Sequence, residues 1–182
     1  DATYYADFVK DLQARLKSRA YQPTPAHRKW IPKPKGGQRP LGICIIRDRV
    51  VQMLLKMLIE PIAESDFLEC SYGFRPGRRT MDCIGICRRY IQSATKYYWI
   101  VEGDIKGCFN HIRHDHLMTI IQQRIADRQV LILIERFLKA GVLDGQWYES
   151  TQEGVPQGSV VSPLLANLYL HQFDLWWWKE YG

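Results

Sequence analysis

The stretch WIVEGDIKGCFNHIRHDHL (residues 99–117) decides how the fold is interpreted. Its first apolar residues predict a buried strand over about 97–104, with Asp104 at the strand's end. A carboxylate is costly to bury unless a positive charge meets it. Magnesium accepts carboxylate and carbonyl oxygens, so Asp104 is a candidate ligand. The alternatives are that Asp104 caps a turn, or that Lys106 simply neutralises it.

The composition predicts a folded, intracellular type of protein. With 182 residues, 46% of them hydrophobic and six of them Trp, the chain can bury a core. No apolar run is long enough to span a membrane, and the first residues do not resemble a signal peptide. The five cysteines form no C-x-x-C pair, which favours reduced, buried thiols and a cytoplasmic location.

Positive charge is concentrated at the start of the chain. Residues 1–60 contain 12 Lys and Arg against 5 Asp and Glu, whereas the remaining residues are nearly neutral. A basic first third on a neutral body indicates a polyanionic partner. The alternative is a solvated surface that is merely basic.

Outward from the opening stretch, the pattern predicts mostly helices. Residues 21–40 contain five prolines and two glycines, which favours an extended arm or hairpin with KGGQR at its tip. A hairpin is predicted around 144–145, and SYGFRPGRR (residues 71–79) reads as a loop. Helices are predicted over about 3–19, 47–64, 80–95, 114–125, 128–140 and 159–181. This order favours the α+β class.

Two further motifs carry possible chemistry. Lys33, Lys35 and Arg39 flank the Gly-Gly tip, and such a tip can fold over a triphosphate. The alternative is a solvated β-turn. In EGVPQGSVVSPLLANLYL a Pro-Gln-Gly turn leads into a helix, where Gln157 could hydrogen-bond a sugar or a base edge. The alternative is an ordinary helix entry capped by Ser159.

Together these motifs resemble the group II intron-encoded reverse transcriptases, also called maturases. The resemblance extends over nearly the whole chain. It is carried by YQPTPAHRKWIPKPKGGQRPLGI, RDRVVQMLLKMLIEPIAESDFLECSYGFRPGR, YWIVEGDIKGCFNHIRHDHL and GVPQGSVVSPLLANLYLHQFD. Reverse transcriptases associated with CRISPR adaptation proteins, or belonging to other retroelements, share much of this pattern and are alternatives.

The resemblance implies a metal site. In such enzymes the aspartate of the DIKGCF motif and the carbonyl of the next residue bind catalytic Mg²⁺, with Mn²⁺ as the alternative ion. Here these are Asp104 and Ile105. Two divalent ions can stabilise both the attacking and the leaving oxygen when a primer hydroxyl displaces pyrophosphate.

The resemblance also implies how a nucleotide is held. Lys33 and Arg39 match cations that grip the incoming triphosphate, and Gln157 matches a glutamine beside the nucleotide. Phe109 matches a steric gate whose ring would clash with a 2′-hydroxyl and favour dNTP over rNTP. As an alternative, Phe109 is a core aromatic residue, and the two roles are compatible.

A third implied group faces the template. Arg75 matches a position on the template side, and Arg78 and Arg79 would contact phosphates there. The alternative is that an arginine in such a Gly- and Pro-containing loop braces the loop by bonding backbone carbonyls.

The chain also departs from the family pattern. It lacks the Tyr-Ala-Asp-Asp turn that supplies further carboxylates, and it stops at Gly182, about where that hairpin would begin. The resemblance therefore implies fingers (1–96 and 112–158) and part of a palm (97–111 and 159–182), with a small antiparallel sheet. Thumb and remaining palm are absent, so no primer extension is expected from the isolated chain.

The expected partners are group II intron RNA or another RNA template, a DNA primer and dNTP, with no membrane. Helical finger surfaces also allow dimerisation. Two other functions stay open at this point. One is a non-catalytic RNA-binding module that assists splicing, because basic residues give salt-sensitive affinity for phosphates. The other is a helical scaffold with a basic surface and no nucleic acid.

Overall fold

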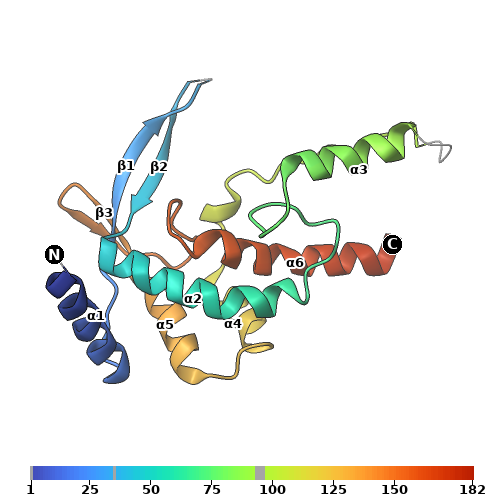
Figure 1. Ribbon diagram of the computed structural model, residues 1–182. Coiled ribbons are helices and arrows are strands. Elements are labelled where there is room, and N and C mark those ends of the chain that lie inside the picture. Colours follow the sequence, from blue (N-terminus) through green and yellow to red (C-terminus); the bar gives the residue numbers. More distant parts are fainter. Residues whose placement is uncertain (1, 35, 93–96) are drawn as a thin grey trace.

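A computed structural model describes residues 2–34, 36–92 and 97–182, apart from the side chain of residue 2 (Figure 1). The described helices are α1 (Ala2–Lys17), α2 (Ile46–Glu64), α3 (Thr80–Gln92), the short 3-10 helix η1 (Cys108–Asn110), α4 (His114–Gln122), α5 (Arg128–Lys139) and α6 (Ser162–Tyr181). The strands are β1 (Ala26–Pro32), β2 (Gln38–Ile43), β3 (Val142–Asp144) and β4 (Trp147–Glu149). These elements confirm the predicted α+β class, and most predicted helices lie within a few residues of their expected bounds.

The four described strands form one sheet in the order β2-β1-β3-β4. Strands β1 and β2 make an antiparallel hairpin from His27↔Ile43 to Pro32↔Gln38. The base of β1 then pairs in parallel with β3, which in turn pairs antiparallel with β4. The predicted antiparallel sheet is therefore wrong in one respect, because the β1–β3 pair makes the sheet mixed. Figure 1 shows the β1–β2 hairpin standing away from the helical body.

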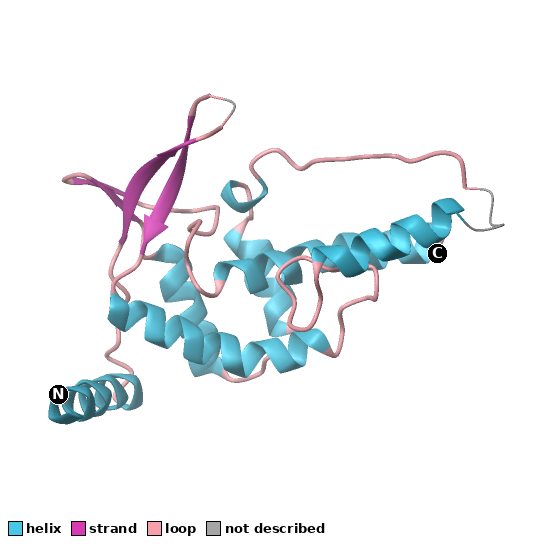
Figure 2. Ribbon diagram, turned by 45° about the horizontal axis from the view of Figure 1, so that its top comes forward, coloured by secondary structure: helices cyan, strands magenta, loops and turns pink. Residues whose placement is uncertain are grey.

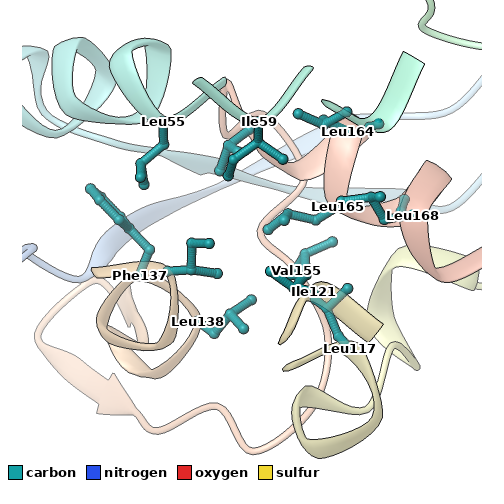
Figure 3. Packing of buried hydrophobic residues seen from close by; sticks show 14 of the residues in the cluster. Leu55, Ile59, Leu117, Ile121, Phe137, Leu138, Val155, Leu164, Leu165 and Leu168 are labelled. Atoms are coloured by element: carbon teal, nitrogen blue, oxygen red, sulfur yellow. The ribbon is translucent and has the colours of Figure 1, made fainter. Parts of the chain in front are cut away.

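The core lies where α2, α4, α5 and α6 meet (Figure 3). Helix α2 buries a stripe with a spacing of four residues, which is the spacing of one helix face. Facing it are apolar residues of the other three helices. The central members are Leu55, Ile59, Leu117, Ile121, Phe137, Leu138, Leu164 and Leu165. Pro163 lies in the first turn of α6, where its missing N–H costs nothing.

The predicted strand over 97–104 is wrong. Residues 97–105 have no regular secondary structure, and Figure 2 shows them as part of a long extended loop leading to η1. Trp99 is 92% exposed and Val101 is 96% exposed. A strand needs a neighbour for its backbone N–H and C=O groups, and no described segment pairs with this one. The apolar pattern is present without the pairing that would make it a strand.

Two smaller expectations can also be compared with the structure. Of the five cysteines only Cys44 is buried, whereas Cys70 and Cys87 are exposed, so the prediction of buried thiols is wrong for these two. All five are free thiols. The predicted helix over 80–95 ends at Gln92 in the described part, and residues 93–96 lie outside it. Within the described ranges, the helices are all too short or too polar to cross a membrane.

Candidate functional site

The tip of the β1–β2 hairpin is a turn that depends on two glycines with positive φ angles. Gly36 and Gly37 have φ angles of 90° and 80°, a region that glycine adopts without strain. The amide of Gly36 donates to the carbonyl of Lys33 at 3.1 Å, and the amide of Lys33 donates to the carbonyl of Gly37 at 3.0 Å. The predicted KGGQR tip is thus confirmed as a tight turn. Lys35, one of its predicted cations, lies outside the described residues.

Three cations share one face of this hairpin. Directly paired residues project to the same side of an antiparallel sheet, and every second residue along a strand does too. The pairs Ile31↔Arg39 and Lys29↔Leu41 therefore place Lys29 and Arg39 on one face, and Lys33 continues the alternation. All three cations are exposed, and none of them forms an ion pair with another described residue. We call Lys29, Lys33 and Arg39 the arm cations.

The opposite face carries an arginine that is already neutralised. Arg28 pairs with Asp144 at 3.3 Å and with Glu149, and its guanidinium lies 5.7 Å from the centre of the Trp30 ring. These contacts tie the hairpin to β3 and β4. A cavity of about 290 Å³ adjoins this face, lined by Arg28, Pro40 and Gly42 among others. Leu41, Asn110 and Gln157 also line this cavity, so it reaches the base of the hairpin and the Pro-Gln-Gly turn.

The base of the hairpin meets the Pro-Gln-Gly turn directly. The amide of Gly42 donates to the carbonyl of Gln157 at 2.7 Å. Gly158 has a φ of 102°, and a Cβ added there would lie 2.8 Å from Cδ1 of Leu41. Leu41 is on the same face as the arm cations, so that face is continuous with the turn. Only glycine allows so close an approach.

The other end of this turn is bonded to η1. The amide of Val155 donates to the carbonyl of Phe109 at 2.7 Å, and the Nε2 amide of Gln157 donates to Oδ1 of Asn110 at 3.2 Å. Gly154 has a φ of 82°, and a Cβ there would lie 2.9 Å from the carbonyl oxygen of Asn110. The loop therefore brings the predicted residues Phe109 and Gln157 together beside the base of the arm.

The ring of Phe109 is half-buried. It packs against the hydrophobic core and meets the ring of Phe74 in a T-shaped arrangement, with centroids 6.4 Å apart and planes at 84°. Phe109 therefore has the packing of a core aromatic residue, while part of its surface stays accessible. This position is compatible with a second role toward a bound sugar.

Asp104 lies on the exposed segment four residues before η1. No hydrogen bond or ion pair joins its carboxylate to any other described residue. The carbonyl of Ile105 accepts from the amide of Cys108 at 3.3 Å, a long bond that leaves its second lone pair open. Both groups are hard oxygen donors of the kind magnesium takes. The described residues contain no cluster of three His, Cys, Asp or Glu side chains that could hold a metal on its own.

Arg75 is not placed for direct contact with a template. Its side chain is only 4% exposed, and Nη2 pairs with Glu64 at 3.0 Å. Nη1 donates to the carbonyls of Leu68 at 2.7 Å and Ser71 at 2.9 Å. The burial contradicts a phosphate contact by this side chain. The alternative is what the structure shows, because Arg75 braces the loop by bonding backbone carbonyls.

Arg78 and Arg79 differ in how strongly their side chains are bound to neighbouring residues. Arg78 donates to the Glu69 carboxylate at 2.7 Å and lies over the Tyr72 ring, and the bond to Glu69 raises the pKa of Arg78. The side chain of Arg79 is 83% exposed, and its guanidinium lies 3.7 Å from the Asp82 carboxylate. Of the predicted template-side residues, Arg79 is therefore the one whose charge points into solvent.

Sequence reasoning missed two participants in this arrangement. Lys29 belongs to the arm cations, and its signal was the two-residue alternation from Lys33 back along β1. Asn110 bonds Gln157 across 47 residues of chain, and nothing in the local pattern indicates that bond.

Comparison with known proteins identifies the family. Residues 31–181 match the model of the reverse transcriptase (RNA-dependent DNA polymerase) family. The chain is 42% identical over 172 residues to Protein YkfC of Escherichia coli, covering 93% of this chain and 45% of that protein. It is 41% identical over 167 residues to Group II intron-encoded protein LtrA of Lactococcus lactis subsp. cremoris, covering 91% of this chain and 27% of LtrA.

A third relative is an uncharacterised 91 kDa protein in the cob intron of Schizosaccharomyces pombe. It is 42% identical over 168 residues, covering 92% of this chain and 20% of that protein. The chain thus spans less than half the length of each of these three relatives. The resemblance to group II intron-encoded proteins is confirmed, and the chain belongs to the reverse transcriptase family.

Proposed function

We propose that the complete protein containing this chain is an RNA-directed DNA polymerase encoded by a group II intron. The observation that carries the proposal is the junction at the base of the arm. One loop is hydrogen-bonded to β2 through Gly42 and to η1 through Phe109, so the arm cations, Gln157 and Phe109 border one region. Relatives named for introns favour this over a CRISPR-associated reverse transcriptase.

Each side chain at the junction has a role in this proposal. Lys33 and Arg39 neutralise the triphosphate of an incoming dNTP, because exposed cations without partners are available to phosphate oxygens. Gln157, oriented by Asn110, lies beside the nucleotide. Phe109 blocks the space that a 2′-hydroxyl would need. Arg79 contacts the template backbone, and Arg75 supports its loop.

Asp104 and the carbonyl of Ile105 would contribute oxygen ligands for magnesium, with Mn²⁺ as the alternative ion. When bound, divalent ions supply the positive charge that stabilises the attacking and leaving oxygens of nucleotidyl transfer. The described donors suit magnesium in type but are too few to hold it alone, so other carboxylates, water or substrate phosphates must complete the set. In domain terms we assign 1–96 and 112–158 to fingers, and 97–111 and 159–182 to palm.

The test uses the complete protein on an RNA template with a DNA primer and dNTP. Asp104→Ala should abolish cDNA synthesis, whereas the control Glu102→Ala removes another exposed carboxylate two residues away and should leave synthesis unchanged. RNA affinity should be the same in both variants. Synthesis by Asp104→Ala at the wild-type rate would contradict the role of Asp104, and an inactive wild-type protein would contradict the proposal itself.

A second function is favoured by the unpaired arm cations. They give the chain a phosphate-binding surface that needs no catalysis, which suits a maturase that binds intron RNA in the cytoplasm and assists its splicing. If the protein is a maturase alone, intron RNA binds and splices while cDNA is never made. If it is both, Asp104→Ala separates the two activities by removing synthesis only.

A further inference from the structure

Gln52 is a buried polar residue whose side chain bonds three residues in two other parts of the chain. It lies on α2 and is 2% exposed. Its side-chain oxygen accepts from Oγ of Ser159 at 3.0 Å and from the amide of Val160 at 2.9 Å, while its Nε2 donates to Sγ of Cys44 at 3.4 Å. Buried polar groups are expensive unless they are bonded, and this one is bonded at both ends.

The partners of Gln52 lie on both sides of the arm's junction with the turn. Cys44 directly follows β2, two residues after Gly42. Ser159 and Val160 follow the Pro-Gln-Gly turn, two and three residues after Gln157. Gln52 thus anchors to α2 both the segment that follows β2 and the segment that follows the Pro-Gln-Gly turn. The hydrogen bond from Gly42 to Gln157 joins these two segments.

One turn earlier on α2, Asp48 bonds the segment that leads into β1, the other strand of the arm. It is 1% exposed and accepts from the hydroxyl of Tyr21, and from the amide of Thr24 at 2.9 Å and its hydroxyl at 2.6 Å. Burial and the bond to Asp48 raise the pKa of Tyr21, so the hydroxyl stays protonated and donates. The same face of α2 therefore fixes the entry to β1 through Asp48 and the exit from β2 through Gln52.

We propose that Gln52 is a positioning residue for the nucleotide site, setting the placement of Gln157 relative to the arm cations. This inference rests on the proposed polymerase function. The reason is geometric, since nucleotide affinity depends on the arm cations and Gln157 reaching one ligand together. An apolar side chain of similar size would fill the space but leave the Val160 amide and Ser159 hydroxyl without a partner, and the turn would move to regain one.

The test compares Gln52→Met with Ile59→Ala in the complete protein. Ile59 is also 2% exposed on the buried face of α2, but it only packs in the core. Gln52→Met should raise the KM for dNTP about tenfold, the equivalent of one lost hydrogen bond, with a smaller change in kcat. Ile59→Ala should lower the melting temperature at least as much without that rise in KM.

A second measurement asks whether the effect passes through the turn. In a Gln157→Ala background, adding Gln52→Met should raise the KM for dNTP less than about twofold, because the group it positions is gone. If Gln52→Met and Ile59→Ala change KM alike, or if the effects of Gln52→Met and Gln157→Ala multiply, Gln52 is structural only. A wild-type protein that extends no primer overturns the polymerase proposal instead, so the two failures are distinguishable.

Discussion

Arg75 and Arg79 lie four residues apart in one loop, and their surroundings give them different roles. Arg75 is inside, bonded to Glu64 and to the carbonyls of Leu68 and Ser71, so its charge is already matched. The side chain of Arg79 is outside, and its guanidinium makes a loose contact with Asp82 at 3.7 Å. In the sequence alone both are candidates for the template side, Arg75 by its position and Arg79 by a phosphate contact. Burial is what separates them, and burial depends on how the loop returns to α2.

This difference predicts opposite outcomes for two substitutions. Arg75→Ala leaves the Glu64 carboxylate partly buried without its partner and should lower the free energy of unfolding by about 3–5 kcal/mol. Arg79→Ala removes an exposed charge and should change it by less than about 0.5 kcal/mol. Urea unfolding followed by circular dichroism measures both.

RNA affinity supplies the complementary comparison. Arg79→Ala should weaken RNA binding while the fold stays intact. In the unfolding experiment, equal free energies of unfolding for Arg75→Ala and Arg79→Ala would show that the Arg75 bonds do not hold the loop in solution.

At the scale of elements, the two faces of the β1–β2 hairpin differ in charge balance. One face carries the arm cations, and the other carries Arg28, which is paired with Asp144 and Glu149. Only unpaired cations are free to replace the counterions around a nucleic acid. The register therefore predicts which face binds RNA.

Replacing all three arm cations with Ala should reduce both RNA affinity and its salt dependence. Each phosphate contact contributes about 0.7 to the slope of log K against log salt for a single strand, so the slope should fall by about 2. The control changes Arg88, Arg89 and Arg128 to Ala, which are three exposed cations outside the hairpin. Fluorescence anisotropy across a salt series gives the slopes. Equal losses in both triple variants would mean that net charge, rather than the arm, governs binding.

The elements also show what a sequence can and cannot predict. Helices such as α2 and α5 were predictable because their apolar spacing and backbone bonds are local. The Gly-Gly tip was predictable from turn chemistry. The strand over 97–104 failed because pairing depends on a neighbour, and the parallel contact between β1 and β3 joins residues more than one hundred positions apart.

The same distinction applies to the candidate site. Phe109 and Gln157 were selected from motifs, and the structure brings them together. The bonds that achieve this, through Asn110, Gly154 and Gln52, link distant segments and leave no periodic trace in the sequence. Asp104 keeps its assignment as a proposal, although the buried strand that first drew attention to it is absent from the described residues.

At the scale of the whole molecule, large apolar surfaces face solvent. The exposed segment at 97–101 is one, and the end of α6 from Phe173 to Tyr181 is another. Side chains of Phe173, Trp176, Trp177 and Tyr181 contact one another there, but each stays about half exposed or more. Patches of this kind mark surfaces that are covered by another structure or that promote association.

Residues 1–182 on their own should therefore bind the dye ANS and show no primer extension. Dye binding is expected because these apolar surfaces are exposed, and no extension is expected because the described residues contain no cluster of carboxylates that could hold the ions. The control is a longer protein that supplies a Tyr-Ala-Asp-Asp turn, which should bind less dye and extend the primer. Extension by residues 1–182 alone would show that the described oxygen donors suffice.

The hairpin's attachment has a mechanical consequence. Its base is fixed by Gly42, Asp48 and Gln52, whereas an added Cβ at Gly36 or Gly37 would meet no atom within 4 Å. Strand β1 is about 23 Å long at its usual rise, so a tilt of about 10° at the base displaces the tip by about 4 Å. Any tilt of the arm would therefore pivot about its base, which is held against the core, and would displace the tip most. A small shift of the contacts at α2 would therefore move the tip by a distance comparable with the size of a phosphate group.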